Sequence, residues 1–156
     1  MKVSLILVGK TSDKHIEALL NDYVSRLSHY LTFEVITISE KSSSRNQSIA
    51  EQKEAEGKLI LEKVKDNAQM VLLDEHGVEY RSLEFASYME KQLNTGRELC
   101  FVIGGPYGFS DDVYRRSNGK ISLSKMTFSH QMVRVIFTEQ LYRAMTILKG
   151  EKYHHE

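Results

Sequence analysis

Two short segments combine residue types that could hold a ligand. The first, Gly104-Gly105-Pro106-Tyr107-Gly108, follows the apolar run Leu99–Ile103, and its glycines can let the main chain approach a ligand or adopt a positive φ. No Gly-Lys-Ser/Thr follows, which excludes a Walker-type phosphate loop, and the spacing does not fit the dinucleotide fingerprint. The segment therefore indicates either a tight turn between a strand and a helix or a site for a nucleotide-like ligand without a bound triphosphate.

The second segment, Leu123–Phe128, mixes hydroxyl groups, one lysine and apolar side chains directly before a helical pattern. Its backbone could hydrogen-bond the edge of an adenine, and its apolar side chains could pack against the ring. A structural interpretation stays open beside this one, in which Ser129 caps the next helix while Met126 and Phe128 belong to the core.

Two basic side chains follow on the last helical segment. His130 and Arg134 are four positions apart, so they project from one face near the start of that helix. Arg134 lies between Val133 and Val135, and an arginine in such an apolar stretch is usually paired or functional because an unpaired buried charge is costly. His130 alone more often bonds a helix terminus than acts as a catalyst. The absence of HExxH and G-x-S-x-G patterns disfavours a metal site and a serine hydrolase.

The elements that must position these residues alternate between strand-like and helix-like patterns. Strands are predicted at residues 3–8, 33–38, 70–73, 99–103 and 120–123, and helices at residues 12–30, 48–65, 82–93, 111–116 and 129–148. Ser12, Ser48 and Ser82 are the predicted N-terminal caps of the first three helices. Continuous apolar strands separated by helices are typical of an α/β fold, with a parallel sheet covered by helices on both faces.

In such a sheet, ligands bind beyond the carboxyl ends of the strands, where the connecting loops gather. Three of the predicted strands end in segments with unusual chemistry, namely Leu73–Gly77, Gly104–Gly108 and Leu123–Phe128. We therefore expect these three segments to form a single pocket.

Composition narrows the class of protein further. The 156 residues fit one domain, residues 1–156, and no apolar run approaches the roughly 18 residues that a membrane span requires. The single cysteine, Cys100, excludes an internal disulfide and favours a reducing cytoplasm. Basic and acidic residues balance at 21 each, which argues against a general nucleic-acid coat protein. Residues 39–48, rich in serine and basic residues, are expected to be an exposed loop.

Five motifs occur in a fixed order along the chain, and they are Met1–Lys10, Leu72–Gly77, Phe101–Phe109, Leu123–His130, and Arg134 with Glu139–Ala144 and Tyr153-His154. In this order and at this length, they resemble the ribosomal RNA large subunit methyltransferase H family. The resemblance covers the whole chain. Ser129 departs from it, because other members often carry Pro at that position, and this could change the angle at which the last helix begins.

The resemblance implies a fold and an activity that composition and spacing do not show. The fold would be of the SPOUT class, an α/β knot with a deep trefoil knot near the C-terminus. The protein would be a homodimer whose active sites are completed across the two-fold interface. It would transfer a methyl group from S-adenosyl-L-methionine (SAM) to N3 of pseudouridine 1915 in 23S rRNA, within the assembled ribosome in the cytoplasm. No metal and no membrane would take part.

The resemblance also assigns roles to residues by motif position. By motif position the SAM contacts would be Leu73, Gly104 and the run Leu123, Ser124, Lys125, Met126, Thr127 and Phe128. Gly105 is expected to join them, because a side chain there would fill the space where the backbone meets the ligand. The chemistry of methyl transfer to N3, rather than motif position, makes Arg134 the candidate to stabilise negative charge on the target base, and His154, with His130, the candidates to take the proton of N3. Tyr153, His154 and Arg143 would bind the RNA.

Two other functions stay open. The chain could be a SAM-binding, ribosome-associated module without transferase activity, because a fold does not fix a function. It could also be a SPOUT methyltransferase that acts on transfer RNA, although the short chain has no added RNA-binding domain. Labelled SAM incubated with ribosomes and with free transfer RNA separates the three possibilities.

Overall fold

The computed structural model describes residues 2–39 and 47–155, and its centre is a five-stranded sheet. The strands are β1 (Lys2–Val8), β2 (Thr32–Ile38), β3 (Gln69–Glu79), β4 (Leu99–Ile103) and β5 (Gly119–Ser122). They lie in the order β2-β1-β4-β3-β5, and each neighbouring pair is parallel. The predicted parallel α/β sheet is therefore confirmed. Most of the expected loop at residues 39–48 lies outside the described residues.

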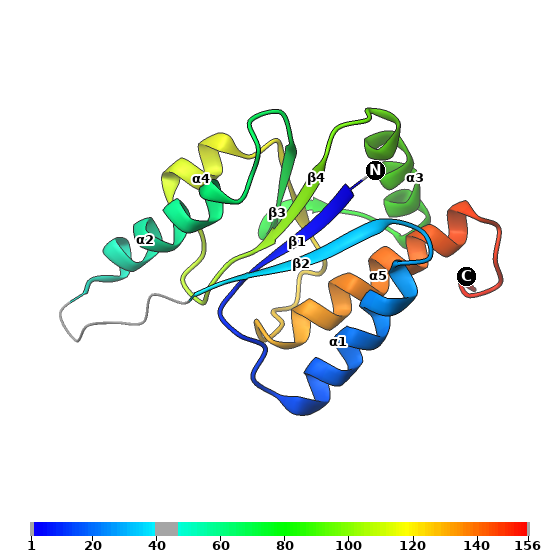
Figure 1. Cartoon of the computed structure of the whole chain (residues 1–156), viewed down its shortest axis with the longest axis horizontal. Coiled ribbons are helices and arrows are strands. Elements are labelled where there is room, and N and C mark those ends of the chain that lie inside the picture. The colour runs from blue at the N-terminus through cyan, green and yellow to red at the C-terminus, as the bar shows by residue number, and fades with distance from the viewer. Residues whose placement is uncertain (1, 40–46, 156) are drawn as a thin grey trace.

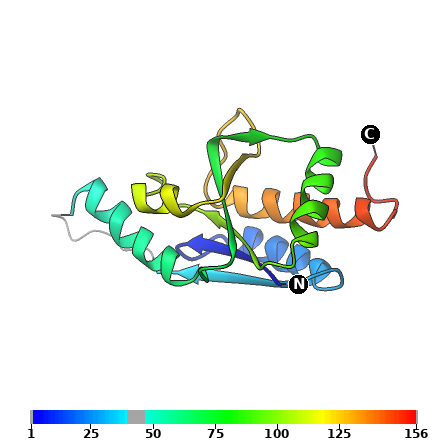
Figure 2. The same ribbon diagram turned by 90° about the horizontal axis from the view of Figure 1, so that it is seen from above.

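Helices cover both faces of this sheet (Figures 1 and 2). One face carries α1 (Lys14–Leu27), α3 (Ser82–Asn94) and α5 (Met132–Leu148), and the other carries α2 (Ile49–Glu62) and α4 (Asp111–Arg116). Each face has its own apolar core. Phe101 of β4 and Phe137 of α5 meet in the larger core, with ring centroids 4.7 Å apart.

The starts of the helices depend on local hydrogen bonds that the sequence predicts only in part. Asp13, rather than Ser12, caps α1, and its carboxylate accepts bonds from two backbone N–H groups of the first turn. The pKa of Asp13 is lowered because the backbone N–H of Ile16 and then that of His15 bond its charged form. The cap at Ser48 is confirmed, since its hydroxyl accepts from the Glu51 N–H.

Several other predicted helix boundaries are wrong. Helix α1 ends at Leu27 instead of Tyr30, helix α2 ends at Glu62 instead of Lys65, and Arg81 rather than Ser82 occupies the cap position of α3. Helix α5 begins at Met132, three residues after the predicted Ser129. The Ser129 hydroxyl still accepts a bond from the Met132 N–H at 3.1 Å, so the predicted hydrogen bond occurs without the predicted boundary.

Strand β3 extends past its predicted end at Leu73. Leu73 and Val78 both pair with Ile121 of β5, so the intervening residues bulge out of the sheet. A Cβ at Gly77 would lie 2.5 Å from the carbonyl carbon of Ile121, so the close approach of β3 and β5 there requires glycine. The predicted loop at residues 73–77 is therefore a bulge within a continuing strand.

Two further expectations concern the whole chain. The trefoil knot stays a prediction. Among the helices of the described part of the chain, none is long and apolar enough to cross a membrane.

Candidate active site

A single cavity of about 460 Å³ lies where three segments of the chain meet. These segments are the bulge in β3, the turn after β4 and the loop between β5 and α5, as the convergence of strand ends predicts. All nine residues expected to contact SAM line this cavity, namely Leu73, Gly104, Gly105, Leu123, Ser124, Lys125, Met126, Thr127 and Phe128. The structure thus brings together residues up to 55 positions apart in the sequence.

The glycine turn after β4 packs closely against neighbouring side chains. Gly108 has a φ of +83°, and its N–H donates to the Gly105 carbonyl at 3.2 Å. A Cβ at Gly104 would lie 2.9 Å from the Phe109 ring, and a Cβ at Gly105 would lie 2.9 Å from a carboxylate oxygen of Glu56. A side chain at Gly104 would thus meet the Phe109 ring, which itself lines the cavity, and one at Gly105 would meet Glu56 behind the turn.

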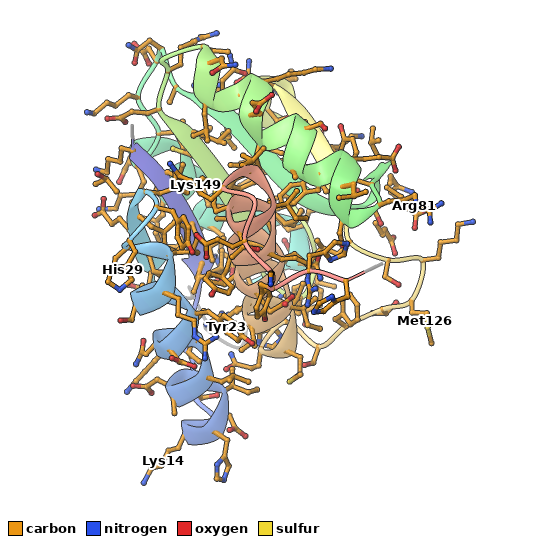
Figure 3. The ribbon with its side chains drawn as sticks, turned by 90° about the vertical axis from the view of Figure 1, so that its right-hand side faces the viewer. Lys14, Tyr23, His29, Arg81, Met126 and Lys149 are labelled. Atoms are coloured by element: carbon orange, nitrogen blue, oxygen red, sulfur yellow. The ribbon has the colours of Figure 1, made fainter. Side chains whose placement is uncertain are left out.

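The loop between β5 and α5 is tied by its own serines. The Ser122 hydroxyl donates to the Ser124 carbonyl, and the Ser124 hydroxyl accepts from the Met126 N–H, both at 3.0 Å. The Met126 side chain is 78% exposed, so the expectation that it belongs to the core is wrong (Figure 3). Phe128 is only half-buried. Apolar side chains therefore stand at the open side of the cavity.

Carboxylates form another part of the cavity wall, and sequence reasoning gave them no role. Asp74 accepts a 2.5 Å hydrogen bond from the Tyr114 hydroxyl and a 2.8 Å bond from the His76 N–H. Burial, followed by the bond to Asp74, raises the pKa of Tyr114 to about 12. Asp74, Glu75 and Tyr114 all line the cavity. The acidic pair was visible in the sequence, but Tyr114 lies 40 positions away and had no recognisable signal.

Arg134 is buried, as its apolar neighbours predict, with only 1% of its surface exposed. Its guanidinium donates to the Val8 carbonyl at 2.9 Å, to the Thr11 hydroxyl at 2.8 Å and to the His130 carbonyl at 3.1 Å. These bonds join the start of α5 to the end of β1. Arg134 is not among the residues that line the cavity, whereas His130 is, so the catalytic role of Arg134 stays a prediction.

The residues expected to bind RNA gather on α5 and the segment after it. Arg143 contacts His154 Nδ1 at 3.1 Å and donates to Glu139 at 2.6 Å. The Tyr153 hydroxyl donates to the same Glu139 at 2.9 Å and lies 3.4 Å from the Tyr23 hydroxyl. Burial, followed by its bonds to Tyr23 and Glu139, raises the pKa of Tyr153.

This network lies apart from the cavity within one chain. The start of α5 borders the cavity, whereas the C-terminal segment lies at the other end of that helix (Figure 1). Figure 3 shows Tyr23 beneath the C-terminal segment and Met126 out at the edge of the molecule. Arg143, Tyr153 and His154 do not line the cavity, so the structure does not bring them together with His130.

The cavity presents apolar surface together with charges of both signs, because Lys125 lines it as well as Asp74 and Glu75. Leu123 and Phe128 offer apolar surface, the turn after β4 offers backbone groups, and Asp74 and Glu75 offer negative charge. The volume is within the range of small-molecule sites, roughly 300–1,000 Å³. Among residues 2–39 and 47–155, no group of three or more His, Cys, Asp or Glu side chains could hold a metal ion.

Comparison with known proteins places this arrangement in a class. The family described as "Predicted SPOUT methyltransferase" matches residues 1–154, nearly the whole chain. A five-stranded parallel sheet between helices, with a cavity at its strand ends, is therefore the fold of a SPOUT methyltransferase, and the chain is an enzyme of this class.

Curated relatives identify the family within that class. Proteins called "Ribosomal RNA large subunit methyltransferase H" from Bacteroides thetaiotaomicron and Flavobacterium psychrophilum are 54% and 52% identical over 157 residues, with full coverage of both chains. One from Christiangramia forsetii is 54% identical over 156 residues, covering 99% of each chain. The chain belongs to the ribosomal RNA large subunit methyltransferase H family, so the resemblance seen in its motifs is confirmed.

Proposed function

We propose that this enzyme transfers a methyl group from SAM to N3 of pseudouridine 1915 in 23S rRNA, within the assembled ribosome. The names of its relatives support ribosomal RNA as the substrate. The observation that carries the proposal is the convergence of nine separately assigned residues on one cavity. A ribosomal substrate would place the reaction in the cytoplasm.

The cavity fits SAM in both charge and surface. Its apolar side chains, Leu123, Met126 and Phe128, can flank the adenine, and the main chain at Gly104 and Gly105 can approach the ligand closely. When bound, SAM supplies a methyl group on a positively charged sulfur. Asp74, Glu75 and Lys125 all line the cavity, so charges of both signs can meet a ligand that carries both.

The remaining chemistry concerns the target base. Methyl transfer needs alignment above all, so the walls of the cavity contribute by holding the reacting groups in line. The imide N3 must lose its proton before it attacks well. His130, at the cavity, and His154 are the groups proposed to take that proton, because the reference pKa of histidine lies near neutrality. Arg134 bonds the His130 carbonyl, and any stabilisation of the base by Arg134 stays a prediction.

The proposal includes a homodimer. Tyr153, His154 and Arg143 lie away from the cavity of their own chain, so they can take part in catalysis only if a second copy brings its C-terminal segment to the cavity. A two-fold interface would do this at both sites at once.

Labelled SAM tests the proposed function directly. Ribosomes that have not been modified at this position should acquire label in the 23S rRNA, and free transfer RNA should acquire none. Tight SAM binding without labelled RNA would favour a binding module. Label in transfer RNA would favour the other class of SPOUT enzyme.

A further inference from the structure

Behind the glycine turn lies a buried carboxylate that neither the proposed chemistry nor the sequence motifs use. Glu56, on α2, is 4% exposed, and the next residue, Gly57, is also buried. The Gln52 side chain donates to Glu56 Oε2 at 3.3 Å. Burying a carboxylate is costly, and a helix that needed only to pack on the sheet would be served as well by an apolar side chain.

The Glu56 carboxylate occupies the space that a side chain at residue 105 would take. A Cβ at Gly105 would lie 2.9 Å from Glu56 Oε1, closer than real Cβ contacts, and 3.5 Å from Oε2, an ordinary van der Waals distance. The positive-φ glycines are Gly9, Gly96, Gly108 and Gly150, so the backbone of Gly105 would accept another residue. A side chain at residue 105 would therefore have to displace the Glu56 carboxylate.

The next residue of α2 holds the other end of the same segment. A Cβ at Gly57 would overlap the Ser110 hydroxyl and lie 3.2 Å from Val113 of α4. Ser110 caps α4 by accepting from the Val113 N–H at 3.3 Å. Consecutive residues of α2 therefore lie against both ends of the segment from Gly105 to Ser110, and residues 105–109 of this segment line the cavity.

We propose that Glu56 is a positioning residue for ligand binding, with its carboxylate holding the turn at Gly105 in the conformation that receives SAM. This inference rests on the proposed function only in taking SAM as the ligand of the cavity. Glu56 itself is not among the residues that line the cavity, so it would act through the main chain of Gly105.

Calorimetric titration with SAM tests the role of Glu56, with thermal unfolding recorded in parallel. Glu56→Ala and Glu56→Gln should each raise the Kd for SAM at least about tenfold, at a temperature where both variants are fully folded. Ile60→Val is the matched control, because Ile60 is equally buried on the same helix one turn away. It should lower the melting temperature and leave the Kd within about twofold of wild type.

A double-mutant cycle tests whether Glu56 acts through Gly105. Gly105→Ala alone should weaken SAM binding strongly, because the new Cβ meets the carboxylate. In the Glu56→Ala background the same substitution should cost little, so the double variant should bind no worse than Glu56→Ala alone. Equal costs in both backgrounds would overturn the inference, as would unchanged Kd values in both Glu56 variants. If wild type itself binds no SAM, the proposed function fails and the inference fails with it.

Discussion

At the scale of single residues, polar groups in this protein are held by partners far away in the sequence. Arg134 shows this well. Its apolar neighbours were enough to predict burial and pairing, since a buried charge needs partners. Its acceptors Val8 and Thr11 lie 126 and 123 positions away, so only the folded chain identifies them.

The bond between Tyr114 and Asp74 predicts how stability depends on pH. The pKa of Tyr114 is about 12 in the folded protein, and that of an unfolded tyrosine is about 10. The folded state therefore holds this proton more tightly. Its contribution to stability is complete below pH of about 10 and is lost as the pH rises toward 12.

Urea unfolding at pH 8, 10 and 11 measures this effect. The free energy of unfolding should fall across this range, and Tyr114→Phe should make the fall shallower because it removes one of the titrating groups. A tyrosinate absorbance titration of the same variant should lose one group that ionises late. The same pH dependence in both proteins would contradict the assignment.

At the scale of elements, the apolar runs and the cap and turn residues between them predicted most of the helices and strands. Strand β4 and helix α4 have the bounds that their sequence patterns indicate, because a short apolar run and a serine cap are local signals. The continuation of β3 was missed, since Asp74-Glu75-His76-Gly77 has the composition of a turn. Its pairing with β5, more than forty positions later, keeps it within the sheet.

The bulge in β3 provides a test with a control in the neighbouring strand. Gly77→Ala would place a Cβ 2.5 Å from the Ile121 backbone, so β3 and β5 must separate there and the cavity wall must move. We expect a lower midpoint in urea unfolding and a Kd for SAM raised at least about tenfold. A Cβ at Gly119, on β5, would meet nothing within 4 Å. Gly119→Ala should therefore leave the urea midpoint and the Kd for SAM within error of wild type. Similar behaviour of the two variants would contradict this account of the bulge.

At the scale of the whole molecule, one chain holds a cavity at one end of α5 and a cluster of Arg143, Tyr153 and His154 toward the other. Convergence of strand ends is a general property of parallel sheets, so the three loops that form the cavity could be predicted. The separation of the C-terminal segment from that cavity could not, because no local pattern states where a terminal segment folds back.

Mixed dimers test whether the active site is shared between two chains. A variant that lacks residues 153–156 and a Gly105→Val variant should each be nearly inactive alone. Coexpressed in equal amounts, they should recover about a quarter of wild-type activity, since half of the dimers are mixed and each of those has one intact site. No recovery would show that each chain builds its own site. Sedimentation should give twice the chain mass of 18.0 kDa for wild type and both variants.

We propose that the bulge in β3 and the two loops after β4 and β5 form one binding site for the methyl donor. A crystal structure of the protein grown with S-adenosylhomocysteine, the demethylated product, tests it most directly. Density for the adenosyl group is expected against Leu73, Gly104 and the segment Leu123–Phe128. Density for the ligand at any other place, with this cavity empty, would contradict it.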